Sequence, residues 1–400
     1  MMDTIWEDFN KKKYTILLAI LVFSLTLFAQ EIQEEAVAIN IEVPVRVFKG
    51  KTFIENLTID DFEIYENGVL QTVDAVYFIR KAEIKRKEIK EPENKTINEK
   101  QTAFSPDLSR TFVFMFEIIE YLPKIGDVLD YFFESMIRPD DSLFIATPLK
   151  TYKFNSQASE GFSKEDIANQ LKRILRAVTS ISSSEYRSQL RHINTIEKQD
   201  PTVVGGDQKK YQLLDALGHL KQLRYFDVEK AVDFANYLKK KEGQKHVFFF
   251  FQKTRMPISK YLSEIDEMGL LHDISLDSNK LKRAFADSTI SCNFLYITKT
   301  ITESSDLRPL PLTGKVTKLM ESAMDSFRGF SEIAEVTGGL IDSSANVAAS
   351  FERAVDYSES YYLLYYSPLY YMADGKFKNI KVKVKGQGYR ITHRTGYVAN

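Results

Sequence analysis

The sequence is poor in cysteine and histidine, and this scarcity excludes several kinds of site. Its one cysteine, Cys292, can form no disulfide within the chain, so the hydrophobic core must stabilise the fold. Cys292 lies in the apolar segment ISCNFLYI, where a buried structural role is favoured over a nucleophilic one. The five histidines are scattered and show no metal-ligand spacing such as H-E-x-x-H.

The sequence also lacks the short motifs of common enzyme classes. It has no G-x-S-x-G elbow of a serine hydrolase, and no G-x-G-x-x-G follows an apolar segment. Gly50-Lys51-Thr52 resembles the end of a phosphate-binding loop, but Val45 occupies the position of the first glycine. Gly338-Gly339 is best explained as the turn that ends a helix. We therefore expect no catalytic residues, no cofactor and no enzymatic activity.

Neither sign of charge is in excess. Lys and Arg number 54 against 55 Asp and Glu, a formal net charge of −1, which argues against a dedicated nucleic-acid-binding protein. A hydrophobic content of 44% is ample for a packed core. Four hundred residues suit one α/β domain together with a β domain.

The only strongly apolar run near the N-terminus is too short for a typical membrane-spanning helix. Lys11–Lys13 precede the apolar residues 14–28, and Ala29 follows them. A spanning helix needs roughly 20 apolar residues, so we predict a cleaved signal peptide over residues 1–29 and export to the periplasm or cell surface of a bacterium. The alternative is an uncleaved anchor, which would be the chain's one contact with a membrane.

Alternating and helical patterns divide the rest of the chain. Residues 36–80 and 358–400 alternate apolar and polar positions, which predicts β segments, and we expect them to form one β-sandwich. Residues 81–109 are rich in Lys and Glu and predict a solvated linker. Residues 110–357 form the inserted α/β domain. Within it, residues 156–242 predict a helical insertion, with helices near 164–178, 184–198, 208–222 and 227–242.

One apolar segment indicates where a site would lie. Thr111–Phe116, TFVFMF, reads as a strand buried on both faces, and residues 121–137 continue with helical spacing. In an open parallel sheet, ligands bind beyond the carboxyl ends of the strands. Glu117–Tyr121 therefore lies where a binding site is expected.

The order of these segments resembles the von Willebrand factor type A fold, and in particular secreted bacterial VWFA-related proteins. GQKHVFFFFQ at 243–252 resembles the fourth strand of that fold, and SFRGFSEIAEVTGGLID at 326–342 resembles its late helix and following strand. The resemblance implies an α/β, Rossmann-like, mostly parallel sheet flanked by helices. It also implies a protein that binds another protein.

The same resemblance points to a lost metal site. Type A domains that bind ligands through a metal carry D-x-S-x-S after the first strand, and here Glu117, Ile119 and Tyr121 occupy those positions. The distal aspartate of the family would fall at 252–254, which is Gln-Lys-Thr. We expect metal-free contact with an unidentified protein. The predicted contact residues are Glu117, Ile119, Glu120, Tyr121, Lys253 and Arg255. The alternative is a metal-dependent adhesin in which Glu117 and Glu120 hold Mg²⁺.

Overall fold

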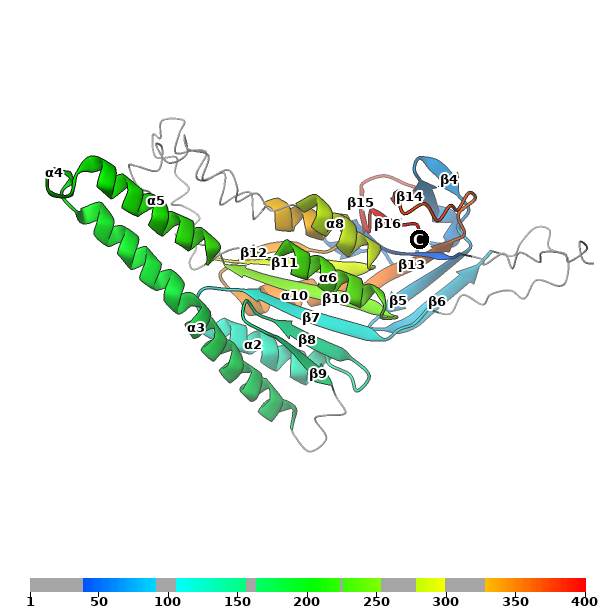
Figure 1. Ribbon diagram of the computed structural model, residues 1–400. Helices are drawn as coiled ribbons and strands as arrows, with labels where there is room; N and C mark the ends of the chain where they lie inside the picture. The colour runs from blue at the N-terminus through cyan, green and yellow to red at the C-terminus, as the bar shows by residue number, and fades with distance from the viewer. Residues whose placement is uncertain (1–38, 91–105, 156–162, 224–225, 253–277, 299–327) are drawn as a thin grey trace, which may run out of the picture. The chain divides into compact units, whose positions relative to one another are not determined.

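The computed structural model describes residues 39–90, 106–155, 163–223, 226–252, 278–298 and 328–400. These residues form a mixed α/β structure with three sheets (Figure 1). The predicted signal peptide, residues 1–29, lies outside the described residues.

The central sheet has six strands in the order β12-β11-β10-β7-β8-β9. Five of them run parallel, and β9 pairs antiparallel with β8 at one edge. The predicted strand at 111–116 is confirmed, since it lies within β7 between β10 and β8. Its side chains are almost all apolar because both faces of the sheet are covered. The strands are β7 (Arg110–Glu117), β8 (Ser142–Ala146), β9 (Thr151–Asn155), β10 (Gln244–Gln252), β11 (Ile290–Ile297) and β12 (Ile341–Ser344).

Helices cover both faces of this sheet. On one face, Phe114 and Phe248 pack with α2, α10 and the first turns of α3. On the other face, Phe249 and Phe294 pack with α6, α8 and a helix over 328–336. The bounds are α2 (Pro123–Tyr131), continued by a π-helical turn (Phe132–Met136), α6 (Val228–Lys239), α8 (Ser278–Asp287) and α10 (Val347–Glu359).

The other two sheets combine strands from both ends of the chain. One has the order β15-β1-β13-β5-β6, with β2 also paired to β1, and the other has the order β16-β14-β3-β4. Tyr362 packs on Phe62, and the Tyr366 hydroxyl donates to Glu66 at 2.7 Å, so side chains join the two sheets. The early strands are β1 (Ile41–Lys49), β2 (Thr52–Phe53), β3 (Phe62–Glu66), β4 (Val69–Gln71), β5 (Ala75–Arg80) and β6 (Glu83–Ile89). The late strands are β13 (Ser360–Tyr366), β14 (Phe377–Val384), β15 (Tyr389–His393) and β16 (Gly396–Val398).

The prediction of a solvated linker over 81–109 is wrong for its first part. Residues 83–89 form β6, which pairs antiparallel with β5 after a turn in which Lys81 and Ala82 adopt positive φ. Most of the lysines and glutamates at 83–89 that suggested a linker are exposed side chains of an edge strand, where charge discourages pairing with another chain, and the half-buried Glu88 accepts a hydrogen bond from Ile59 N. Residues 91–105 lie outside the described part of the chain.

The predicted helical segment contains one helix that was expected to be two. Residues 164–178 and 184–198 belong to a single 35-residue helix, α3 (Lys164–Lys198). The helix continues through its serine-rich middle, where the Ser183 hydroxyl donates to Thr179 O within the helix. The N-cap is Ser163, whose Oγ accepts from Asp166 N at 3.0 Å. The segment continues with α4 (Pro201–Val204) and α5 (Gly206–Gln222).

Helices α3 and α5 lie side by side and are joined through α4 (Figure 1). Their contact has its own apolar cluster, in which Tyr186, Ile193 and Ile196 of α3 meet Leu213 and Leu217 of α5. The first turns of α3 pack instead on the cluster beneath α2. No helix in the described residues combines the length and the apolar character needed to cross a bilayer.

The turn Thr337–Gly339 connects the helix at 328–336 to β12. Thr337 Oγ1 donates to Ile333 O at 2.8 Å and accepts from Cys292 N at 3.1 Å. Gly338 has φ +70°, a conformation that glycine adopts without strain, so the predicted helix-ending turn is confirmed. Its carbonyl accepts from the buried Arg46 of β1 at 3.2 Å. The turn therefore contacts both the central sheet and the sheet that contains β1.

Candidate functional site

The predicted site lies where β7 and β10 end. These adjacent parallel strands place Glu117 and Gln252 at the same edge of the central sheet. The chain leaves β7 through residues 118–122 and enters α2 at Pro123, which occupies the first helical turn and needs no hydrogen-bond acceptor for an N–H. The carboxyl edge therefore presents a short loop followed by a helix.

The side chain of Gln252 fastens this loop. Its Oε1 accepts hydrogen bonds from Ile119 N at 3.0 Å and Glu120 N at 2.9 Å, and its Nε2 donates to Glu120 O at 2.9 Å. Gln252 is 3% exposed. A neutral carboxamide thus satisfies three backbone groups at the position where the type A resemblance would place an acidic metal ligand.

The other predicted contact residues differ in exposure. Glu120 is exposed, and Glu117 is half-buried. Ile119 packs against the apolar cluster between α3 and α5, which the sequence did not indicate. Lys253 and Arg255 were also predicted as contact residues, but they lie outside the described residues.

Tyr121 is engaged within the chain. Arg176 of α3 lies over its ring at 5.0 Å, and the Tyr121 hydroxyl lies close to Gly126, where an added Cβ would meet it at 3.1 Å. Partial burial raises the pKa of Tyr121, and the nearby Arg176 opposes this effect. Both Ile119 and Tyr121 therefore link the loop to the helical segment.

The described residues contain no group of three or more His, Cys, Asp or Glu placed to hold a metal ion. Glu117 and Glu120 are the two carboxylates at this edge that the sequence proposed as Mg²⁺ ligands, and the loop contributes an isoleucine and a tyrosine in place of hydroxyl ligands. Mg²⁺ prefers an octahedral set of oxygen ligands. This donor set does not fit that preference.

Replacing Gln252 with alanine is expected to lower the free energy of unfolding by about 2–3 kcal/mol, because two N–H groups and one carbonyl lose their partner. Urea unfolding followed by circular dichroism measures the change. Gln170→Ala, on an exposed position of α3, is the matched control and should shift stability by no more than about 0.5 kcal/mol. Equal effects of the two variants would show that Gln252 does not fasten the loop.

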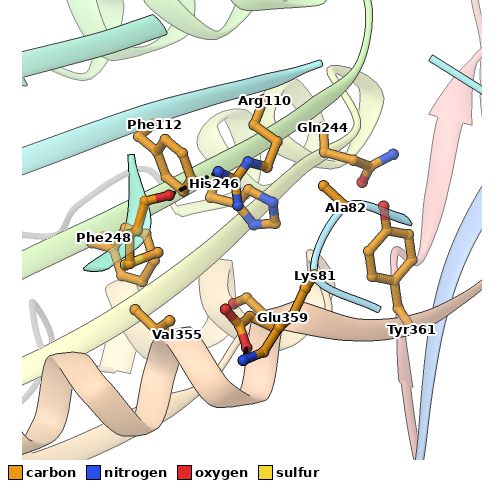
Figure 2. Close-up of a pocket in the computed structure, with 12 residues that line it drawn as sticks. Lys81, Ala82, Arg110, Phe112, Gln244, His246, Phe248, Val355, Glu359 and Tyr361 are labelled. Carbon is orange, nitrogen blue, oxygen red and sulfur yellow. Dashed lines mark hydrogen bonds and ion pairs between the residues drawn. The ribbon is translucent and has the colours of Figure 1, made fainter. Parts of the chain in front are cut away.

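A pocket lies at the opposite, amino-terminal edge of the sheet (Figure 2). Arg110 and Phe112 of β7 and Gln244 and His246 of β10 line it, together with residues of the β5–β6 turn, α10 and β13. Figure 2 shows His246 among the labelled side chains of this pocket, and no pattern in the sequence indicated a pocket at this edge. The pocket therefore sits where the α/β part meets the strands of the chain ends.

The pocket's ionisable groups are neutral or paired. Burial lowers the pKa of His246 to about 3, and burial raises the pKa of Tyr361. His246 stacks on Phe112, and its Nδ1 has no hydrogen-bond partner among the described residues. Ser358 donates its hydroxyl to Ala354 O at 2.8 Å, so His246 does not activate it. These groups suit the junction of two sheets better than nucleophilic chemistry.

Comparison with known proteins gives little guidance. No model of a protein family matches the chain, and no curated protein matches it. Among solved structures, the human COPII-coat protein Sec24c is similar over 73% of this chain and 44% of its own, with 8% identity and a TM-score of 0.28. The chain thus spans less than half the length of that protein. A similarity this weak supports no assignment of fold family or function.

Proposed function

We propose that the chain is an exported, non-enzymatic protein–protein interaction module of the von Willebrand factor type A kind, with a degenerate metal site. The mostly parallel central sheet, with helices on both faces, supports this reading. So does the order of sequence segments along the chain. The partner is another protein, which binds at the carboxyl edge of the sheet.

One observation carries the proposal. At the carboxyl edge, Gln252 uses both ends of its carboxamide on the backbone of Ile119 and Glu120. A metal-dependent type A domain needs this region to offer carboxylate and hydroxyl oxygens to a cation. Here the loop is held by neutral hydrogen bonds, so it is ordered without a cation. A loop ordered in this way can form part of a binding surface without a cation.

We propose no catalytic role for the chain. Nucleophilic catalysis needs a hydroxyl or thiol beside a base. Cys292 is buried, and burial raises the pKa of its thiol to about 12, so it remains protonated at neutral pH. Among the described histidines, the buried His246 has an Nδ1 without a partner, and Nε2 of His393 accepts from Val382 N. The proposed module therefore acts by binding.

Addition of Mg²⁺, Mn²⁺ or Ca²⁺ to the EDTA-treated protein is expected to leave its thermal unfolding midpoint unchanged. A cation present at about 100 times its Kd would stabilise the native state by about 2.7 kcal/mol, which is readily measured. Glu117→Gln is the matched variant and should behave like the parent protein with every ion. A saturable shift that Glu117→Gln abolishes would instead establish the metal-dependent alternative, with Glu117 and Glu120 as ligands.

A further inference from the structure

The long helix α3 is packed along one side and open along the other. Near its start, Ile167, Leu171 and Leu175 pack into the core beneath α2. Farther along, Tyr186 and Ile193 pack against α5. A helix of 35 residues is about 52 Å long at 1.5 Å per residue. Its buried side chains follow one side for that whole length, which leaves the opposite side to solvent.

The open side of α3 forms a continuous stripe, which we call the arginine face. Its residues recur every three or four positions, so they line one side of the helix. All of them are exposed: Arg173, Arg176, Ala177, Ser180, Ser184, Arg187, Ser188, Arg191, Asn194, Thr195 and Lys198. From Arg173 to Lys198 the stripe runs about 38 Å.

The arginine face carries charge of one sign. It has four arginines and one lysine and no acidic residue, although the whole chain has a formal net charge of −1. Glu185 of the same helix lies off the stripe and faces His219 of α5, at 3.4 Å. No ion pair among the described residues engages Arg173, Arg187 or Arg191. Arg176 lies over the ring of Tyr121, so Arg173, Arg187 and Arg191 supply the positive charge that is available to an external partner.

This charge arrangement has a cost within the helix. Arg187 and Arg191 are four residues apart, and like charges at that spacing destabilise a helix by about 0.2–0.5 kcal/mol. An acidic partner would turn this repulsion into attraction. Opposite charges across an interface also speed association and fix its register. Ser180, Ser184 and Ser188 lie between the basic groups and can donate hydrogen bonds to the same carboxylates.

We infer that the arginine face of α3 binds an acidic segment of another protein. An acidic helix with carboxylates at i, i+4 and i+7 would match the spacing of the stripe along its length. Ala177 is the one apolar residue on the face, and Ile181, which is 64% exposed, lies beside it. One large apolar side chain is fewer than a membrane-inserting helix needs, and the face has no aromatic ring to stack on nucleic-acid bases. The inference rests on the proposed function as an interaction module. The arginine face meets the Glu117–Tyr121 loop only where Arg176 lies over Tyr121, and the three arginines changed in the test are other residues.

The test measures, by fluorescence anisotropy, the binding of a fluorescently labelled 21-residue helical peptide of three heptads. Glutamates at the first and fifth positions of each heptad give the spacing i, i+4, i+7 along the peptide. The purified protein is expected to bind this peptide, with a Kd that rises at least tenfold between 50 and 300 mM NaCl, since salt screens exposed charges. The triple variant Arg173→Glu, Arg187→Glu, Arg191→Glu is expected to weaken binding at least tenfold. Glutamate and arginine have similar helix propensities, so α3 should keep its fold, which circular dichroism checks.

The matched control is Lys381→Glu, Lys383→Glu, Lys385→Glu, which changes the net charge equally on the exposed side of β14 and the turn after it. It should change the Kd no more than twofold. If both triple variants weakened peptide binding equally, the effect would be due to net charge alone and the inference would be wrong. It would also be wrong if no peptide bound at 50 mM NaCl, or if the protein bound only to vesicles with 30% phosphatidylglycerol or to duplex DNA. If the peptide does not bind and the thermal unfolding midpoint does not depend on divalent ions, the inference is wrong but the proposed function is not contradicted. A midpoint that depends on divalent ions would contradict the proposed function, whatever the peptide does.

Discussion

Replacing Gly339 with alanine is expected to lower the free energy of unfolding by about 3 kcal/mol or more, because the added methyl group would overlap the backbone of a neighbouring strand. A Cβ at this position would lie 1.9 Å from Cys292 O and 2.5 Å from Cys292 C. Both are backbone atoms of β11, so they cannot move aside as the end of a flexible side chain could. The turn must shift away from the central sheet.

That shift would break several contacts. Leu340 N donates to Asn293 Oδ1 at 3.0 Å, and Phe294 N donates to Leu340 O at 2.7 Å, so the residues after the turn are fixed to β11. Urea unfolding of Gly339→Ala measures the loss. Gly218→Ala is the control, because a Cβ there meets nothing within 4 Å and alanine is the better helix former within α5. It should be neutral or stabilising by up to about 1 kcal/mol. A Gly339→Ala protein as stable as Gly218→Ala would contradict the tight packing of this turn.

Replacing Asp141 with alanine is expected to cost about 3–5 kcal/mol, because it leaves a buried arginine without its counter-charge. Asp141 accepts from Arg110 Nε at 2.9 Å and Nη2 at 2.6 Å, and it also accepts from Arg138 N at 2.7 Å. The two side chains are 9% and 4% exposed. Water can therefore do little to solvate the orphaned guanidinium.

Two further variants separate this ion pair from ordinary surface charge. Asp127→Ala removes a partner of Lys124 in a pair whose side chains are about half exposed, and should cost at most about 1 kcal/mol. The double variant Arg110→Met, Asp141→Leu removes both charges and should recover part of the stability lost by Asp141→Ala. Chemical unfolding of all three proteins gives the comparison. If Asp141→Ala lowered the free energy of unfolding no more than Asp127→Ala does, Arg110 would have to find another partner or reach solvent.

The sequence predicted the central strands because burial leaves a direct signature. Residues 111–116 and 247–251 are nearly all apolar, and both segments lie inside the sheet with helices on each face. Apolar composition does not identify a strand whose formation depends on pairing with a neighbouring strand. Residues 83–89 carry the composition of a linker, yet they pair with β5 as an edge strand because one ladder of hydrogen bonds suffices there.

The candidate site was only partly predictable. The position of Glu117–Tyr121 at a strand end followed from the chain order, whereas the role of Gln252 depends on the register between β7 and β10. When a glutamine follows an apolar strand, the sequence does not show whether its side chain is buried and hydrogen-bonded to a loop or exposed to solvent. Its contacts became visible only with the fold.

The arginine face illustrates a different limit. Its three- and four-residue spacing is present in the sequence, but the sequence analysis predicted two helices, at 164–178 and 184–198, where the structure has one. Splitting the helix also splits the stripe, and each half then shows only two or three basic residues. Side-chain hydroxyls bonded within the helix, such as Ser183 to Thr179, allow this polar stretch to continue the helix.

The position of β13 has a consequence for how the protein is made. β13 lies between β1 and β5, so two early strands have no central neighbour until Ser360–Tyr366 have been synthesised. At typical translation rates that interval is on the order of tens of seconds. The parallel sheet can assemble during this time, while the unpaired edges of β1 and β5 remain open to pairing with other chains. The nascent protein therefore passes through a long aggregation-prone stage that ends only when its last strands emerge.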